Sequence, residues 1–234
     1  MSVLANPREN ILPRDILQES RHWELLRKRQ AKKFHRSVFR VDGNYVVKKF
    51  EISIDVRFYP RPWQAEDACL RLLGGCGAPR SYGWFEEVEN GHRVVWLVKE
   101  YVPGTSMEYF RNSDMPAIAS LMAGIHKRRI FTDDASIGNI IRTLDGHMVF
   151  LDFGRAVRMG KYCQCLDARI GRELAKLRRE GFRWDTALWN EFLPLYFNAL
   201  GCSGGRRFRI RAACCAAMVL RILRKYMGGK PPMS

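Results

Sequence analysis

Residues 126–154 read HKRRIFTDDASIGNIIRTLDGHMVFLDFG, and this stretch decides the expected fold. Two short apolar segments, IIRT and MVFLDF, flank the turn residues Leu-Asp-Gly-His, a pattern typical of a small hairpin. Asp134 lies in the loop before the first segment, Asn139 directly precedes that segment, and Asp152 follows the second. Three polar side chains around one hairpin predict a chemical site.

The spacing of these residues suits magnesium and proton chemistry. An aspartate in such a loop can orient an acceptor hydroxyl and take its proton, and the side-chain oxygen of an asparagine five residues later can hold magnesium. Asp133 competes for the first role, and the five-residue offset to Asn139 selects Asp134. Asp152 can present its carboxylate to a metal that bridges phosphates. The alternative is that these aspartates are ordinary turn and capping residues.

Upstream, the segment YVVKKF predicts a strand on which Lys48 and Lys49 face opposite ways. We assign Lys48 to the inner face. Glu66 follows 18 residues later on a helix expected over 63–73, where it can pair with Lys48 and hold that lysine against nucleotide phosphates. Each residue alone is a weak signal, because exposed strand lysines and solvated helix glutamates are common.

The expected elements divide the chain into three parts and give an α+β fold class. Residues 1–36 are expected to form an N-terminal leader, in which residues 14–33 carry helix formers and then a basic run. Residues 37–102 are strand-rich, with hairpin turns at Asp-Gly and Asn-Gly. Residues 103–234 begin at a Pro-Gly break and are mainly helical. Their helices are expected over 116–128, 165–180, 185–200 and 206–227.

Taken together, these motifs resemble the bacterial lipopolysaccharide core kinases, a group within the kinase-like superfamily. The group includes the 3-deoxy-D-manno-octulosonic acid (Kdo) kinases, the heptose kinases and InaA-like proteins. The resemblance covers about residues 37–180 through VVKKF, KEYVPG, HKRRIFTDDASIGNII and FLDFGRAV. It implies a bilobal protein-kinase-like fold, with 37–102 as the nucleotide-binding lobe. It also implies ATP and Mg²⁺ as cofactors and an inner-core sugar hydroxyl as acceptor.

The resemblance also implies roles for individual residues. It implies that Lys48, Glu66 and Asp134 are catalytic, that Asn139 and Asp152 bind the metal, and that Lys48, Glu100 and Val102 contact the nucleotide. Two features depart from the family pattern. No Gly-x-Gly-x-x-Gly loop precedes the lysine, where FHRSVFRV stands instead. Thr132 occupies the position of a usual histidine, which predicts the loss of one hydrogen bond that supports the loop.

The choice of acceptor leaves two alternatives open. Helical character resumes about ten residues after Gly154, and no Ala-Pro-Glu motif follows, so little room is left to dock a peptide. This disfavours ordinary protein kinases, but an atypical serine/threonine protein kinase of the RIO-like type lacks the same platform. A non-catalytic basic module that binds lipid or nucleic acid is the other alternative, although the expected Lys and Asp residues are all present.

Charge and apolar content point to the partners and the compartment. The net charge of +16 favours anionic partners, and we expect an anionic glycolipid as acceptor, peripheral contact with an anionic membrane, and no nucleic acid. Basic residues expected near the acceptor are Arg155, Arg158, Lys161, Arg169 and Arg172.

The cysteines and the apolar segments point to the compartment. The seven cysteines predict reduced thiols in the cytoplasm. The longest apolar stretch, 212–220, is too short to span a bilayer, so we expect location at the cytoplasmic face of the inner membrane. The basic helix over 206–227 either packs on its lobe or binds membrane.

Overall fold

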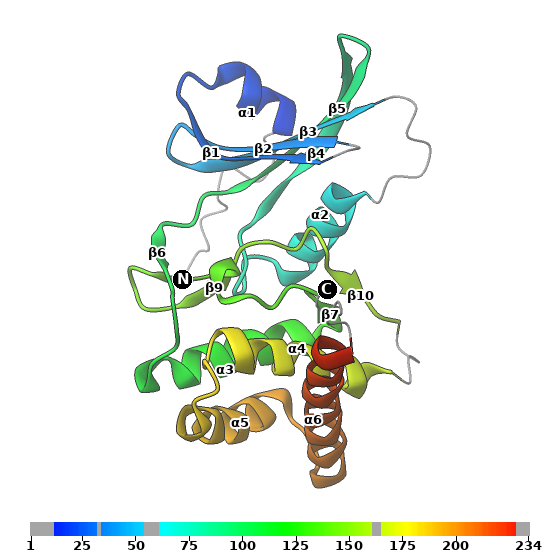
Figure 1. Ribbon diagram of the computed structural model, residues 1–234. Helices are drawn as coiled ribbons and strands as arrows, with labels where there is room; N and C mark the ends of the chain where they lie inside the picture. Colours follow the sequence, from blue (N-terminus) through cyan, green and yellow to red (C-terminus); the bar gives the residue numbers. More distant parts are fainter. Residues whose placement is uncertain (1–11, 32–33, 54–60, 161–164, 228–234) are drawn as a thin grey trace, which may run out of the picture. The chain divides into compact units, whose positions relative to one another are not determined.

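The structure is a computed structural model that describes residues 12–31, 34–53, 61–160 and 165–227. The chain divides into two compact units, Met1–Pro103 and Gly104–Ser234. The first unit contains an antiparallel sheet and two helices, and the second is mainly helical (Figure 1). The fold class is therefore α+β, with the large sheet in the N-terminal unit and most helices in the C-terminal unit.

The sheet of the first unit has five strands in the order β1-β2-β3-β5-β4, and all neighbouring pairs are antiparallel. The strands are β1 (Trp23–Ala31), β2 (Phe34–Val41), β3 (Tyr45–Ser53), β4 (Ser81–Glu89) and β5 (His92–Glu100). The two predicted hairpins are confirmed. Asp42 and Gly43 have φ of 45° and 71°, and Asn90 and Gly91 have φ of 49° and 74°. Tight hairpin turns need this left-handed backbone, which Asp, Asn and Gly tolerate best.

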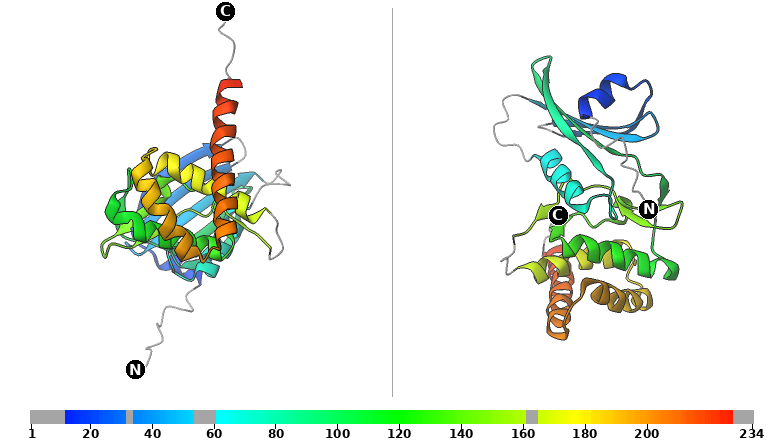
Figure 2. Two further views of the ribbon diagram at one scale, coloured as in Figure 1. Left: turned by 90° about the horizontal axis from the view of Figure 1, so that it is seen from below. Right: turned by 180° about the vertical axis from the view of Figure 1, so that it is seen from behind.

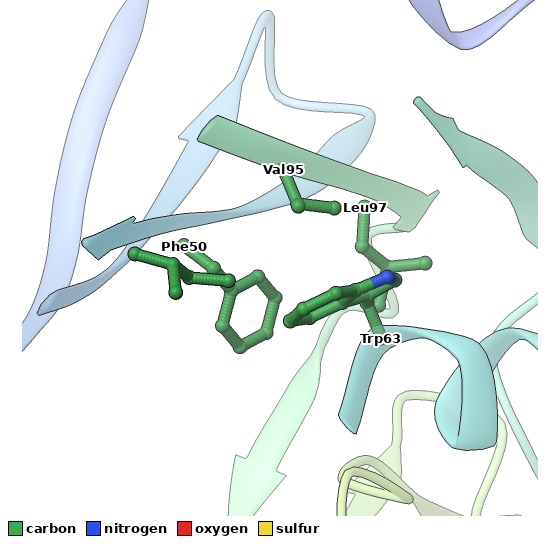
Figure 3. Packing of buried hydrophobic residues seen from close by; sticks show 5 residues of the cluster. Phe50, Trp63, Val95 and Leu97 are labelled. Carbon is green, nitrogen blue, oxygen red and sulfur yellow. The ribbon is translucent and has the colours of Figure 1, made fainter. Parts of the chain in front are cut away.

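Two helices, α1 (Pro13–Glu19) and α2 (Pro62–Leu73), contribute to separate cores on opposite faces of this sheet. Trp63 of α2 packs with Phe50, Val95 and Leu97 (Figure 3), and its ring lies 5.4 Å from that of Phe50. Ile16 of α1 packs in the other core. Because successive strand residues alternate between faces, β3 and β5 each supply both cores. The helix predicted over 63–73 is confirmed, and it ends at the left-handed Gly74.

The segment 14–33 differs from the expected helical leader. Helix α1 ends at Glu19, and β1 then forms the outer strand of the sheet, paired with β2 from Trp23↔Val41 to Ala31↔Phe34. The side chains of residues 21–30 are exposed. An edge strand with exposed side chains needs no alternating apolar pattern, so its sequence carries no strand signal, and the backbone pairing with β2 holds it in place.

The second unit combines small sheets with four α-helices. Strands β6 (Gly104–Ser106), β8 (Ile140–Thr143) and β9 (Met148–Phe150) form one sheet in the order β6-β8-β9, and β7 (Ile130–Phe131) pairs with β10 (Val157–Arg158). The helices are α3 (Met115–Lys127), α4 (Leu166–Glu180), α5 (Thr186–Leu200) and α6 (Gly204–Met227), with short 3-10 turns at Asn112–Asp114 and Ile137–Asn139. All four predicted helices and the predicted hairpin are present, although β9 ends three residues earlier than expected.

Helices α3 and α5 pack together, as do α4 and α6 (Figure 2). The first part of α6 is packed, because Ile210 and Cys214 are buried. Its later part leaves apolar side chains exposed, namely Val219, Leu220, Ile222 and Leu223. The helix therefore packs on its own unit and also keeps an apolar end in solvent. Among the described residues, no helix combines the length and apolar character needed to cross a bilayer.

Candidate active-site residues

Lys48 and Glu66 form a buried ion pair within the first unit. The Lys48 Nζ lies 2.8 Å from Oε1 and 2.7 Å from Oε2 of Glu66, and both residues are almost fully buried. Alternation along β3 places Lys48 on the same sheet face as Phe50, which packs against α2, the helix that carries Glu66. The strand register and the amphipathic helix thus bring the two predicted residues together.

A second lysine, which the sequence analysis missed, shares the same carboxylate. Lys99 of β5 donates to Glu66 Oε1 at 2.7 Å and is also buried. Its signal in the sequence is the alternation of VVWLVKE, which places Lys99 on the face of Val95 and Leu97. Glu66 therefore joins two neighbouring strands to α2, and each partner offsets the cost of burying the others' charges.

Lys49 lies on the opposite face of the sheet, as predicted. Its Nζ is 3.0 Å from Glu51, 3.1 Å from Glu89 and 4.8 Å from the centre of the Trp96 ring. Partial burial disfavours the charged form of Lys49, but hydrogen bonds to Glu51 and Glu89 outweigh it and raise the pKa above its ordinary value. The two adjacent lysines thus occupy separate environments, and Lys49 belongs to a surface cluster.

Residues 100–102 lead out of β5, and their backbone is tied to the first unit. The Glu100 amide donates to the carbonyl of Arg80 at 2.9 Å, and the Glu100 carboxylate accepts from the Arg80 amide at 3.0 Å. The next amide, that of Tyr101, donates to the carbonyl of Asn44 at 2.8 Å. Val102 follows and is half-buried. These contacts fix the path of the chain through the residues predicted to lie beside adenine.

In the second unit, Asp134, Asn139 and Asp152 lie around the β8–β9 hairpin. The Asn139 side-chain amide donates to the Asp134 carbonyl at 3.0 Å, and the Asn139 carbonyl accepts from the Leu151 amide at 2.8 Å. Asp152 follows Leu151, and its Oδ1 accepts from the Gly154 amide at 3.0 Å. Asn139 therefore links the loop that carries Asp134 to the strand end that carries Asp152.

The two adjacent aspartates contact different cations of α4. Lys176 forms an ion pair with the Asp134 carboxylate, whereas Arg169 lies 3.2 Å and 3.3 Å from the two oxygens of Asp133. Asp133 has φ of 50°, a left-handed conformation that turns the chain between the two side chains. The loop thus separates the carboxylates, and Lys176 is a further polar contact of Asp134 that spacing along the sequence did not reveal.

A buried network beneath this loop was also missed. The Glu173 carboxylate accepts from the Thr132 hydroxyl and from the Asp133 amide, both at 2.7 Å, and lies 2.8 Å from Nε2 of His126. The other ring nitrogen of His126 lies 2.7 Å from the Tyr196 hydroxyl, and burial raises the pKa of Tyr196 well above its usual range. A sequence signal exists, because Glu173 interrupts the buried stripe of α4.

The Thr132 hydroxyl supports the loop through two hydrogen bonds. It donates to Glu173 and accepts from the Asp134 amide at 3.3 Å. The expected loss of a hydrogen bond at this position is therefore wrong, because the threonine hydroxyl makes two contacts that hold the loop. Thr132 thus links the Asp134 amide to Glu173 of α4, while the Asp133 amide bonds to Glu173 directly.

Asn139 and Asp152 offer side-chain oxygens next to the hairpin. No cluster of three or more His, Cys, Asp or Glu side chains suited to a metal occurs in the described parts of the chain. Magnesium typically uses one or two carboxylates together with substrate phosphates and water. Asp152 would supply one such carboxylate, and Asn139 would add the oxygen of its side-chain amide.

The basic residues expected near the acceptor have different surroundings. Arg169 is engaged with Asp133, Arg172 is exposed on α4, and Arg158 lies in β10. Lys161 lies outside the described residues.

Comparison of the sequence with family models gives no match, and no curated protein matches it either.

Proposed function

We propose that the protein is an ATP- and Mg²⁺-dependent phosphotransferase with a bilobal protein-kinase-like fold. We infer that its acceptor is a hydroxyl of a lipopolysaccharide inner-core sugar, Kdo or heptose. The observation that carries the proposal is the buried Lys48–Glu66 pair, with its shortest N–O distance of 2.7 Å. In protein kinases a lysine of the third strand pairs with a glutamate of the following helix, and this pair positions the nucleotide phosphates. Here the same two residue types occupy β3 and α2.

We assign the remaining groups for phosphoryl transfer to residues of the second unit. Asp134 is assigned to orient the acceptor hydroxyl and to take its proton, and Lys176 holds that carboxylate in place. Asn139 and Asp152 would hold Mg²⁺, which, when bound, neutralises charge on the phosphates. The proposal assigns these residues and Lys48 to one reaction, with Glu100 and Val102 beside the adenine.

The acceptor assignment is supported by charge and by the short segment after Gly154. Helix α4 begins at Leu166, which leaves little chain to form a peptide-docking platform. The net charge of +16 suits an anionic glycolipid and peripheral contact with the cytoplasmic face of an inner membrane. The second candidate, a RIO-like atypical protein kinase, shares the short segment and differs only in its acceptor.

The catalytic assignment is tested by comparing two adjacent substitutions of identical chemistry. Asp134→Asn should lower phosphate transfer from labelled ATP by about 10²–10⁴-fold, since it removes the group that takes the proton. Asp133→Asn should have a much milder effect, because the Asp133 carboxylate contacts Arg169, whereas the Asp134 carboxylate contacts Lys176. Thermal melting checks that both variants fold. Near wild-type transfer by Asp134→Asn would rule out the assignment.

The acceptor is tested by mass spectrometry of core oligosaccharide from cells with and without the protein. A phosphate missing from one core sugar in the cells without the protein supports the glycolipid assignment. Unchanged core phosphorylation, together with labelling of polypeptides by the pure protein, would instead favour the RIO-like protein kinase.

A further inference from the structure

A groove of about 690 Å³ lies between α4 and α6 in the second unit. The two helices run in the same direction, because contacts progress from Asp167–Arg206 through Gly171–Ala213 to Arg178–Met218. Alanines line much of the groove, namely Ala168, Ala175, Ala213, Ala216 and Ala217. Their short side chains leave space between helices that are otherwise in close contact, and the volume falls within the range of small-molecule sites.

The groove is strongly cationic. Arg172, Lys176, Arg179 and Arg221 line it. Lys176 pairs with Asp134 and Arg179 pairs with Glu180, so two of the four cations are already matched by a carboxylate. No carboxylate in the described parts of the chain forms an ion pair with Arg172 or Arg221, and both arginines are exposed. Cations gathered around one hollow repel each other, and a bound oxyanion would offset that repulsion.

An exposed tryptophan at the same groove adds a surface that suits a sugar ring. Trp184 is 48% exposed and follows α4, and its φ of 67° comes directly after Arg183 with φ of 48°. Two successive non-glycine residues in the left-handed region cost about 1–3 kcal/mol each, and such strain concentrates at functional sites. The Arg178 guanidinium lies 6.0 Å from the centre of the Trp184 ring, and the exposed part of the ring can stack on the apolar face of a sugar.

The groove is connected to the candidate catalytic residue. Lys176 lines it and also forms the ion pair with Asp134. One side chain thus joins the hollow to the carboxylate that would accept the hydroxyl proton. A ligand held among Arg172, Arg179 and Arg221 would therefore lie on the side of α4 from which Asp134 is contacted.

We propose that the α4–α6 groove is the acceptor site and that Arg172, Arg179 and Arg221 bind an oxyanion carried by the acceptor, either a phosphate or a sugar carboxylate. The proposal rests on the proposed function for the reaction, but the binding site itself follows from the groove. If the proposal holds, recognition of the acceptor depends on a negatively charged group of the acceptor that lies next to the hydroxyl to be phosphorylated. Trp184 would contact the sugar ring.

The experiment measures the dissociation constant for detergent-solubilised core glycolipid by isothermal titration calorimetry. Three ligands are compared: the intact glycolipid, the same material with its phosphates removed, and material with its carboxyl groups reduced. The test protein carries Arg172→Glu and Arg221→Glu. The matched control carries Lys28→Glu and Arg29→Glu, which make the same charge change on the exposed edge strand β1.

We expect the groove variant to bind intact glycolipid about tenfold or more weakly, and the β1 variant to bind as wild type does. If the oxyanion is a phosphate, this difference disappears with the dephosphorylated ligand. If it is a carboxylate, the difference disappears with the carboxyl-reduced ligand. Either result supports the proposal. Thermal melting of both variants checks that neither loses affinity through unfolding.

Equal loss in both variants would show that total charge alone matters and would overturn the groove assignment. No loss in the groove variant would overturn it too. Both outcomes leave the proposed function standing if wild-type protein transfers phosphate from ATP and Asp134→Asn does not. Wild-type protein that transfers no phosphate would overturn the proposed function instead, whatever the groove binds.

Discussion

The carboxylate of Glu66 accepts hydrogen bonds from two lysines, which makes it possible to remove one without stranding the buried charge. In Lys48→Ala, Lys99 still lies 2.7 Å from Glu66, so the first unit should fold. Nucleotide affinity should fall by about tenfold or more, because the variant lacks the cation assigned to the phosphates. Fluorescence titration with a labelled ATP analogue measures it.

Lys49→Ala is the matched control for this experiment. It removes the same side chain from the adjacent position, where Lys49 contacts the carboxylates of Glu51 and Glu89 and the Trp96 ring. Its nucleotide affinity should stay near that of wild type. Comparable losses in both variants would mean that charge, and not the position of Lys48, determines binding.

Cys214 offers a test of packing at the level of a single thiol. Burial against α4 raises the pKa of Cys214 from 9.0 to about 12, so the neutral thiol is favoured in the folded state. Its contribution to stability is complete below pH 9 and is lost as pH rises toward 12. At pH 9, iodoacetamide should modify the exposed Cys215 quickly and Cys214 only after denaturation. Mass spectrometry of wild type and Cys215→Ser counts the adducts, and rapid modification of Cys214 in the folded protein would contradict the packing.

Residues of the candidate site were easier to predict from sequence when their partners lie close to them along the chain. Strand alternation, a local pattern, indicated that Lys48 and Lys49 face opposite ways; the resemblance to the kinase strand motif then selected Lys48, and Glu66 was chosen from its position on the next helix. Lys99, Glu173 and Lys176 were missed, since their partners lie 33 to 47 residues away along the chain. Local periodicity predicts on which face of a strand or helix a residue lies, but it does not predict which distant element packs against that face.

At the scale of elements, the contact of α4 with α6 depends on one glycine. A Cβ placed on Gly171 would lie 2.6 Å from the Cβ of Ala213 and 2.7 Å from the backbone nitrogen of Cys214. Gly171→Ala should therefore push the helices apart and lower the free energy of unfolding by about 1–3 kcal/mol. Chemical denaturation measures this change.

Gly124 of α3 provides a control with the opposite sign. A Cβ there would meet only the end of the Arg128 side chain, at 3.9 Å. Gly124→Ala should raise the free energy of unfolding by about 0.4–1 kcal/mol, because alanine restricts the unfolded chain and suits a helix interior. A stabilising effect of Gly171→Ala would show that α4 and α6 do not pack as closely as described.

Most elements were predicted from sequence because packing imposes a period on their apolar residues. Helix α2 shows this, since Trp63, Leu70 and Leu73 recur at helical spacing and are buried. Strand β1 was missed because its side chains are exposed, so no period constrains them. Its position depends on backbone hydrogen bonds to β2, which are the same for almost any sequence.

At the scale of the whole molecule, the excess of basic residues predicts salt-sensitive membrane binding. Each Lys or Arg near acidic lipid contributes about 1 kcal/mol, and charges are screened beyond ~8 Å at physiological ionic strength. Sedimentation with phosphatidylserine-containing vesicles should therefore fall steeply as salt rises. Binding to pure phosphatidylcholine vesicles should be weak and should depend little on salt. Equal binding to both would assign the interaction to the exposed apolar end of α6 instead.

The position of β1 at the outside of the sheet has a practical consequence for anyone who trims this protein. A shortened chain starting at residue 37 would lose β1, part of β2 and α1, whose Ile16 covers one apolar core. The remaining part of β2 would then present a row of unsatisfied amides and carbonyls, a template on which other molecules add strands. The shortened protein should precipitate or form fibrils, which means that the solubility of the protein depends on its first 36 residues.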